Sequence, residues 1–326
     1  MSAATATAQP STPAAPILEV KDLTVLFGSR TGGAPVRAVD RVSFFIRPGE
    51  TLGLVGQSGS GKTTTGRAIL QLQKADSGEV RLLGRDLMGM RGAELRSIRR
   101  HMQFIQQNPY SSLHPRLTIG KIIAEPLEVH GTVPREKIPE RVAELLKLVN
   151  LDPQVVTRYP HEFSGGQRQR IVIARALSVN PDFVVCDEAV SALDVRTQAQ
   201  IVELLRDLQN KLGVSYLFIA HDLALVQEMA HRVAVMYTGQ IVEIAPSKRL
   251  YAEPAHPYTR SLLDAIPVPD PAVQRQKLRA APQELKLVDR RSGACIHGED
   301  HAVTGTAPMH VIGPDHEVSC RFLPQN

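Results

Sequence analysis

The residues best suited to chemistry form one run, Gly56-Gln57-Ser58-Gly59-Ser60-Gly61-Lys62-Thr63-Thr64. An apolar stretch, 51–55, precedes the run, and a segment compatible with a helix, 64–72, follows it. Glycines in such a loop let successive backbone N–H groups face an anion, and the start of the helix adds further donors. Lys62 would bring a positive charge to terminal phosphates, and Thr63 a hydroxyl ligand for Mg²⁺. The run predicts a phosphate-binding loop, with a plain glycine-serine turn as the alternative.

Two adjacent acids, Asp187 and Glu188, end the apolar run 183–186. Continuous apolar character is typical of a strand buried on both faces of a parallel sheet, and ligands bind at the carboxyl ends of such strands. One carboxylate there can hold Mg²⁺, and the other can orient or deprotonate an attacking water. A pair of solvated turn residues is the alternative. Cys186, in the same run, is predicted to be a small core residue.

Two more segments carry residues that could act at such a site. His221 follows the apolar stretch 215–220, which predicts a position at the same sheet edge; an ordinary surface histidine is the alternative. The segment from Ser164 to Gln167 opens a predicted helix with a good N-cap and free N–H groups, so it is a second possible anion site. Helix capping alone would also explain these residues.

The composition excludes several classes of protein. The 326 residues are 43% hydrophobic, which suffices for a large core. A net charge of +5, without a block of Lys and Arg or interleaved aromatics, does not indicate a nucleic-acid partner. The three scattered cysteines argue against a disulfide framework. No apolar run approaches the ~20 residues of a membrane span, and residues 1–16 lack signal-peptide features, so we expect a chain that is not exported.

The elements that must position these residues follow from hydrophobic periodicity and turn residues. We expect a disordered tail over 1–16 and then strands over 17–27, 42–46, 78–83 and 102–107. A helical insertion, about 111–166, contains amphipathic helices over 119–130 and 135–150. The core is completed by a helix over 195–212, a strand over 215–220 and a hairpin of 233–237 and 241–245. Frequent prolines after residue 250 mark an appended region, 251–326.

In this order, the phosphate loop, Ser164 to Gln167, Asp187-Glu188, residues 191–194 and His221 make the chain resemble the ATPase subunit of an ATP-binding cassette (ABC) transporter over about residues 17–250. A finer resemblance, to the second ATPase subunit of oligopeptide/dipeptide importers, rests on the segments 107–110, 112–116 and 256–260. The resemblance implies an α/β fold with a P-loop NTPase (RecA-like) core, an antiparallel β subdomain, a helical insertion and an irregular C-terminal extension.

The resemblance also implies a role for each matching residue. ATP would be bound by Phe27, Gly56, Ser58, Gly59, Ser60, Gly61, Lys62, Thr63 and Thr64. Mg²⁺ would be held through Thr63, Asp187 and Gln107, and the catalytic group would be Glu188, His221 and Gln107. The nucleotide of a second cassette would be clamped by Ser164, Gly165, Gly166 and Gln167, with Asp194 at the interface. Phe27 would stack on adenine, although a core phenylalanine is almost equally consistent with its position.

The C-terminal region departs from the pattern of this branch. Its members often carry four cysteines that bind an iron–sulfur cluster, of which only Cys295 and Cys320 have counterparts here. An iron–sulfur cluster is therefore not expected, and the nearby histidines match no standard zinc spacing. We expect a structural or docking role for this region.

The implied function is ATP hydrolysis that powers import of di- or oligopeptides at the cytoplasmic face of the inner membrane. The implied partners are a second ABC ATPase subunit, identical or homologous, two transmembrane permease subunits and, indirectly, an extracytoplasmic solute-binding protein. Nickel or another small solute is an alternative cargo. A non-transport cassette ATPase and an inactive, ATP-binding regulatory cassette are more distant alternatives. The sequence leaves the cargo, the direction of transport and the identity of the second cassette open.

Overall fold

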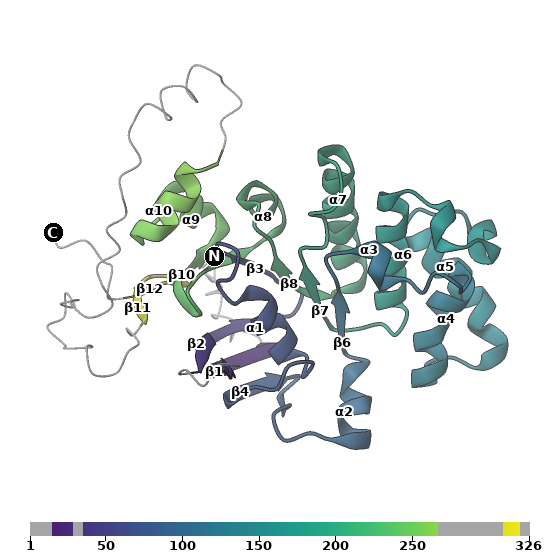
Figure 1. Cartoon of the computed structure of the whole chain (residues 1–326), viewed down its shortest axis with the longest axis horizontal. Coiled ribbons are helices and arrows are strands. Elements are labelled where there is room, and N and C mark those ends of the chain that lie inside the picture. The colour runs from purple at the N-terminus through teal and green to yellow at the C-terminus, as the bar shows by residue number, and fades with distance from the viewer. Residues whose placement is uncertain (1–14, 29–34, 267–308, 320–326) are drawn as a thin grey trace, which may run out of the picture.

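Two sheets organise the computed structural model, which describes residues 15–28, 35–266 and 309–319. The larger sheet has eight strands in the order β11-β12-β10-β9-β3-β8-β7-β6, and the smaller has four in the order β2-β1-β4-β5. The helical insertion and the last two strands lie at opposite ends of the molecule (Figure 1). The larger sheet therefore spans the whole core and determines which residues meet at its edges.

Parallel strands form the centre of the larger sheet, namely β6 (Met102–Ile105), β7 (Phe183–Asp187), β8 (Ser215–Ile219), β3 (Thr51–Val55) and β9 (Arg232–Tyr237). Every residue of β3, β7 and β8 is buried, because both faces of the sheet are covered. Successive side chains point to opposite faces, so Val185 joins one hydrophobic core while Val184 and Cys186 join the other. Cys186 is a fully buried core residue, as predicted.

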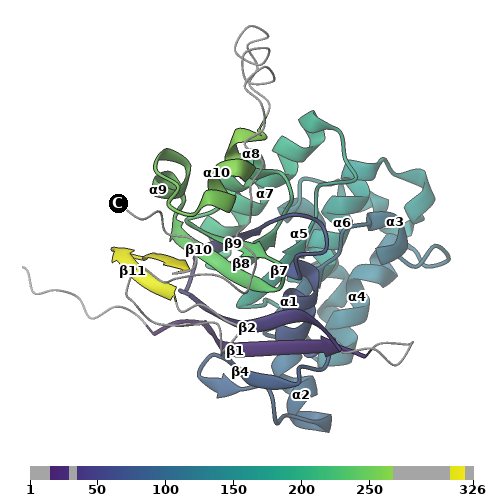
Figure 2. The ribbon, with the colours of Figure 1, turned by 60° about the vertical axis from the view of Figure 1, so that its left-hand side comes forward.

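The smaller sheet covers one face of the larger one, with helix α1 (Lys62–Ile69) between the two sheets (Figure 2). Its strands are β1 (Leu18–Phe27), β2 (Val36–Ile46), β4 (Ser77–Leu82) and β5 (Arg85–Asp86), followed by helix α2 (Gly92–Arg99). All its pairings are antiparallel. Strand β2 begins before the predicted range 42–46, because its pairing with β1 continues to Val36 opposite Phe27.

Helices cover the opposite face and share one core with it. They are α3 (Pro109–Ser112), α4 (Ile119–His130), α5 (Ile138–Leu148), α6 (Gly165–Leu177), α7 (Val195–Leu212) and α8 (Leu223–Met229), with short 3₁₀ turns at Arg135–Lys137, Pro153–Thr157 and Pro160–Glu162. Helix α7 has its predicted bounds: Asp194 accepts a hydrogen bond from the Thr197 amide at its start, and Gly213 ends it at φ 70°. None of the helices in the described ranges is both long and apolar enough to cross a membrane.

The hairpin of β9 and β10 was predicted, but the region after it contains more regular structure than the sequence indicated. Strand β10 (Gln240–Pro246) pairs antiparallel with β9, and helices α9 (Ser247–Ala252) and α10 (Pro257–Asp264) follow. Strands β11 (Met309–Gly313) and β12 (His316–Ser319) form a hairpin, and β12 pairs with β10. This C-terminal hairpin thus extends the main sheet although it is far from β10 in the sequence.

Candidate active site

The predicted site residues meet at one edge of the main sheet because their strands run parallel. The phosphate loop follows β3, Asp187 ends β7, His221 lies just after β8 and Gln107 just after β6. These four strands are neighbours in the order β3-β8-β7-β6. Their carboxyl ends therefore deliver all four groups to the same edge, where ligands of open α/β sheets bind.

Two glycines of the loop, Gly56 and Gly61, allow a backbone path that other residues could not follow. Gly56 has φ 149°, and a Cβ there would lie 2.1 Å from the Met236 carbonyl oxygen. Gly61 has φ 105°, and a Cβ there would lie 2.2 Å from the Ala38 carbonyl oxygen. Gly59, also at positive φ, has open space around it, and Ser58 beside it is exposed. Close packing of the loop against β9 and β2 explains Gly56 and Gly61, whereas Gly59 lies on the side of the loop that faces solvent.

Lys62 lies inside this loop. Its Nζ donates to the Gly56 and Gln57 carbonyl oxygens at 2.8 and 2.9 Å and lies 3.4 Å from Ser60 Oγ. The side chain is buried, which lowers the pKa of the ammonium, while the negative charges of Glu188 and Asp187 oppose that effect. A desolvated cation is thus held by the loop and drawn toward the two acids.

Thr63 and Asp187 join the loop to the neighbouring strand end. Thr63 Oγ1 donates a hydrogen bond of 2.8 Å to Asp187 Oδ1. Asp187 is 4% exposed, and this burial raises the pKa of its carboxyl, whereas the bond from Thr63 and the charge of Arg67 lower it. The carboxylate and the hydroxyl predicted to hold Mg²⁺ are therefore in contact, although 124 residues separate them in the sequence.

Glu188 gathers the other two predicted catalytic side chains. Gln107 Nε2 donates a hydrogen bond of 2.6 Å to Glu188 Oε2, and His221 Nδ1 lies 3.7 Å from the same oxygen. The backbone of Glu188 has φ 47°, a left-handed conformation that is costly outside glycine and typical of functional turns. Gln107 was expected to help hold Mg²⁺ together with Thr63 and Asp187. In the described part of the chain its side chain is bonded to Glu188, and no hydrogen bond joins it to Asp187 or Thr63.

The segment 164–167 forms the capped start of α6. Ser164 Oγ accepts from the Gln167 amide, and the Gln167 side chain accepts from the Ser164 amide, which completes a capping box. Gly166 is required by packing, since a Cβ there would lie 2.5 Å from Thr197 Cγ2. Asp194 caps α7 through Thr197, and these hydrogen bonds lower the pKa of its carboxyl. The starts of α6 and α7 therefore form one unit.

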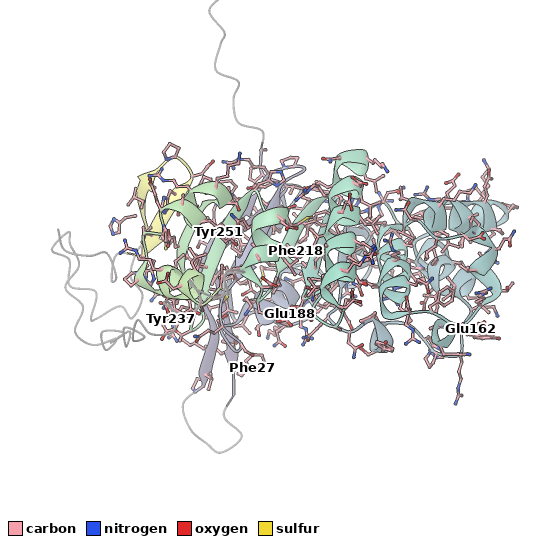
Figure 3. All side chains as sticks on the ribbon, turned by 90° about the horizontal axis from the view of Figure 1, so that it is seen from above. Phe27, Glu162, Glu188, Phe218, Tyr237 and Tyr251 are labelled. Carbon is pink, nitrogen blue, oxygen red and sulfur yellow. The ribbon has the colours of Figure 1, made fainter. Side chains whose placement is uncertain are left out.

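The segment just before α6 lies on the same side of the molecule as Glu188 (Figure 3). Figure 3 shows Phe27, Tyr237, Glu188 and Glu162 along that side, with Glu162 toward the helical end. Ser164, the N-cap of α6, follows Glu162 by two positions. Phe27 ends β1 and is 43% exposed, so it is available for a contact rather than part of the core.

Two residues that sequence analysis passed over also support the loop. The Gly239 amide, in the turn between β9 and β10, donates to the Ser60 carbonyl oxygen at 2.9 Å. The hydroxyl of Tyr258, from α10, accepts a hydrogen bond of 3.0 Å from the Gln57 amide. The tyrosine had appeared only as part of the segment 256–260, and no pattern in the chain links it to a loop 201 residues away.

The structure does not test the candidate cluster ligands of the C-terminal region. Cys295 and Cys320 lie outside the described residues. Within the described ranges, no group of three or more His, Cys, Asp or Glu side chains is arranged to hold a metal ion.

Comparison with protein families gives two matches along the chain. The family described as "ABC transporter" matches residues 39–191. The family described as "Oligopeptide/dipeptide transporter, C-terminal region" matches residues 242–299. The first match contains the phosphate loop, the start of α6 and both acids, and the second contains Tyr258.

Curated relatives and solved structures agree with these matches. The chain is 50% identical over 310 residues to "Glutathione import ATP-binding protein GsiA" of Escherichia coli strain K12, covering 93% of this chain and 48% of that protein. For the protein of the same name from Pectobacterium atrosepticum, identity is 49% over 311 residues, with 94% and 49% coverage. The chain thus spans about half the length of the curated relatives it matches.

Two solved structures share the fold. A dimeric, post-hydrolysis state of the ATP-binding cassette MJ0796 bound to ADP and Pi is 30% identical with a TM-score of 0.64, covering 71% of this chain and 98% of that one. CbiO1 from Clostridium perfringens, part of an ABC transporter complex, is 24% identical with a TM-score of 0.65. The match covers 73% of this chain and 91% of CbiO1. The predicted fold class is confirmed.

Proposed function

Because this chain belongs to the family of ABC transporter ATPases, with the C-terminal region of oligopeptide/dipeptide transporters, we propose that it binds ATP at the carboxyl edge of its main sheet and hydrolyses it to ADP and phosphate. The observation that carries this proposal is the contact between Thr63 and Asp187, 2.8 Å, with Glu188 beside them bonded to Gln107. A hydroxyl, two acids and a buried lysine meet there, which is the set that phosphoryl transfer to water requires.

The phosphate groups of ATP would bind the backbone N–H groups between Gly59 and Thr64, at the start of α1, with Lys62 neutralising their charge. The residues present also fit Mg²⁺, since Thr63 and Asp187 offer hard oxygen ligands in direct contact. Bound Mg²⁺ would supply further charge neutralisation on the phosphates. Phe27, exposed at the end of β1, would stack on the adenine ring.

Glu188 would orient the attacking water and accept its proton as the water oxygen bonds to the γ-phosphorus and the bond to the ADP oxygen breaks. His221 and Gln107 flank Glu188 Oε2, so they would hold the carboxylate and sense the terminal phosphate. Gln107 lies just before the helical insertion, and the start of that insertion is held against α6, because Arg175 donates to the Ser112 carbonyl oxygen at 2.6 Å. This connection would carry the state of the nucleotide to a membrane partner.

A second cassette would complete the site. The start of α6, capped by Ser164, offers backbone N–H groups that would serve nucleotide bound to another cassette. Asp194 would lie at the interface between the two. Closing the pair excludes water and surrounds the terminal phosphate, so hydrolysis is coupled to opening and closing.

The work supported by this cycle would be import of di- or oligopeptides. The proposal rests on the match to the oligopeptide/dipeptide transporter C-terminal region and on relatives that are named for glutathione import. The chain would lie at the cytoplasmic face of the membrane, bound to two permease subunits and supplied by a solute-binding protein. Glutathione is itself a small peptide, so it is the first cargo to test.

Two experiments test these proposals separately. Glu188→Gln should keep ATP binding and lose turnover by about 100-fold or more, since the group that accepts the proton is removed; turnover at the wild-type rate would overturn the catalytic assignment. Membranes containing the whole transporter should take up labelled glutathione or dipeptides with ATP. Uptake of nickel in place of any peptide would overturn the cargo and leave the ATPase intact.

A further inference from the structure

The peptide group between Gly56 and Gln57 is held from both sides. Its carbonyl oxygen accepts from Lys62 Nζ at 2.8 Å, and its N–H donates to the Tyr258 hydroxyl at 3.0 Å. The glycine on one side of this peptide has φ 149°, a region where other residues are strained and rotation is little hindered for glycine. Within the loop sequence, Lys62 holds the carbonyl oxygen of this peptide, and the N–H is held from outside the loop, by Tyr258.

Tyr258 is rigidly placed for this contact. It is 2% exposed, and its ring lies 4.5 Å from the ring of Tyr237, centroid to centroid. Its own amide donates to Nδ1 of the buried His256, the N-cap of α10, at 3.0 Å. Burial lowers the pKa of His256 to about 3, so this imidazole stays neutral and keeps Nδ1 as an acceptor.

A buried carboxylate, Glu243 of β10, fixes the start of α10. Glu243 is 0% exposed and accepts from the Ala255 and His256 amides, each at 2.9 Å. His316 Nε2, from β12, lies 2.9 Å from the same carboxylate. One side chain therefore joins the core sheet, the start of α10 and the C-terminal hairpin, and a buried charge is tolerated only when it is bonded in this way.

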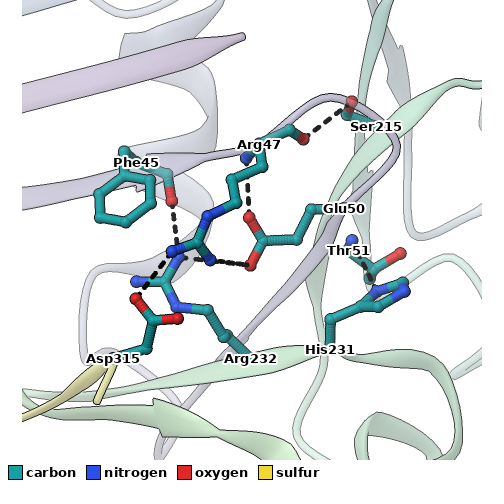
Figure 4. Close-up of polar contacts among 8 residues, drawn as sticks. All are labelled: Phe45, Arg47, Glu50, Thr51, Ser215, His231, Arg232 and Asp315. Carbon is teal, nitrogen blue, oxygen red and sulfur yellow. Dashed lines mark hydrogen bonds and ion pairs between the residues drawn. The ribbon is translucent and has the colours of Figure 1, made fainter. Parts of the chain in front are cut away.

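The turn of the hairpin is attached to the core at a second point (Figure 4). Asp315 accepts from Arg47 Nη2 at 2.7 Å, and the Arg47 amide donates to Glu50 Oε2 at 2.7 Å. Arg232 lies 3.3 Å from Glu50 Oε1 and 4.3 Å from the centre of the Phe45 ring. The turn of the hairpin is thus bonded to the segment between β2 and β3. The contacts that lead from the hairpin to the phosphate loop run instead through His316 and Glu243 to the start of α10 and Tyr258.

We propose that Tyr258 is a positioning residue for the nucleotide site, which holds the Gly56–Gln57 peptide so that Lys62 stays on the phosphate side of the loop. The proposal deepens the proposed function, since it assigns the region after β10 a part in ATP binding. Without the hydroxyl, the peptide can rotate, turn its carbonyl away from Nζ and present an N–H to a cation. Lys62 then loses one of its two carbonyl acceptors and its fixed position.

Hydrogen exchange at the Gln57 amide tests the contact directly in the full-length chain. Tyr258→Phe removes only the hydroxyl and should speed exchange of that amide about fivefold, the worth of one hydrogen bond. Tyr216→Phe is the matched control, because the Tyr216 hydroxyl is also buried and bonded to the main chain, at the Leu205 carbonyl oxygen. Exchange at Gln57 that is equal in the wild type and both variants would overturn the proposal.

ATP binding tests the route through Lys62. Tyr258→Phe should weaken the affinity for ATP about fivefold, whereas Tyr216→Phe should leave it unchanged at equal thermal stability. In a Lys62→Ala background, Tyr258→Phe should add nothing, because the group it positions is gone. An equal loss in both backgrounds would contradict a role through Lys62. A wild-type chain that does not bind ATP would contradict the proposed function instead, while exchange at Gln57 would still decide the contact.

Discussion

Two buried carboxylates of the main sheet, Asp187 and Glu243, are bonded in different ways. Asp187, 4% exposed at the end of β7, accepts one side-chain hydrogen bond, from Thr63, and lies near Lys62. Glu243, 0% exposed in β10, has both oxygens bonded, by two backbone amides and by His316. A carboxylate with acceptor positions left can bind a cation, and a saturated one can only hold segments together. Asp187 therefore belongs to the candidate active site. Glu243 belongs to a structural unit of β10, the start of α10 and the C-terminal hairpin, which we call the frame.

The largest effect should come from neutralising the first carboxylate. Asp187→Asn keeps an acceptor for Thr63 but removes the charge, so we expect ATP turnover to fall about 100-fold or more. Thermal stability should change little, because burial already disfavours the charged form and raises the pKa of this carboxyl. Steady-state hydrolysis and a melting curve give both values. A large loss of stability with turnover preserved would show that Asp187 has a structural role and not a catalytic one.

Neutralising the second carboxylate should mainly affect stability. In Glu243→Gln, the amide NH₂ must face either the Ala255 or the His256 N–H, donor against donor, and the free energy of unfolding should fall by about 2–3 kcal/mol. Urea denaturation measures this loss. The variant should still bind ATP below its transition, with weaker affinity through the displaced Tyr258. Unchanged stability would show that the carboxylate is not the hub of this region.

The frame around Glu243 should also weaken as the pH falls. Burial lowers the pKa of His256 to about 3 from its ordinary 6.5, so the unfolded chain takes up a proton that the folded chain refuses. The stability from this residue is complete above pH 6.5 and is lost progressively below it, by about 2 kcal/mol at pH 5.

His256→Asn provides the comparison for this pH effect. Asparagine can accept the same N-cap bond from the Tyr258 amide without a titrating ring. The unfolding free energy of the wild type minus that of the variant should fall by about 2 kcal/mol between pH 7.5 and pH 5, because only the wild type loses stability through this residue. A constant difference across that range would mean that His256 does not titrate in the way its burial requires.

The smallest effect should come from the exposed end of the hairpin contact. Arg47 and Asp315 are 37% and 41% exposed, and such ion pairs contribute little. Asp315→Asn should therefore lower the free energy of unfolding by only about 0.5 kcal/mol, and less at high salt. Denaturation at low and high ionic strength measures it. If Asp315→Asn lowered the free energy of unfolding as much as Glu243→Gln does, the hairpin would be held mainly by its turn and not by Glu243.

The two regions also differ in how far the sequence reveals them. At the nucleotide edge, each group lies at or just beyond the end of a regular element: Asp187 ends β7, Lys62 begins α1, and His221 follows β8 by two residues. Parallel strands then bring these ends together, so local patterns predict a spatial site. Helix α7 was predicted to the residue for the same reason, with Asp194 and Gly213 as its two caps.

The frame depends on contacts that no local pattern encodes. Tyr258 is bonded to Gln57, which lies 201 positions away in the sequence. Strand β12 pairs with β10, and no residue pattern in either strand indicates the other as its partner. The region after residue 250 was therefore expected to be irregular, while its hairpin, residues 309–319, extends the main sheet. The predicted partnership of Gln107 with Mg²⁺ was drawn from resemblance, and the bond that the side chain makes in the structure is to Glu188.

The most direct test of the whole account is ATP turnover per chain as a function of chain concentration, with Mg²⁺ and saturating ATP. In the proposed cycle, the start of α6 binds the nucleotide held by a second cassette, so each site is completed by its partner. Turnover per chain should therefore rise as pairs form, either with concentration or on adding the partner cassette. Full turnover by a dilute chain that remains monomeric would contradict it.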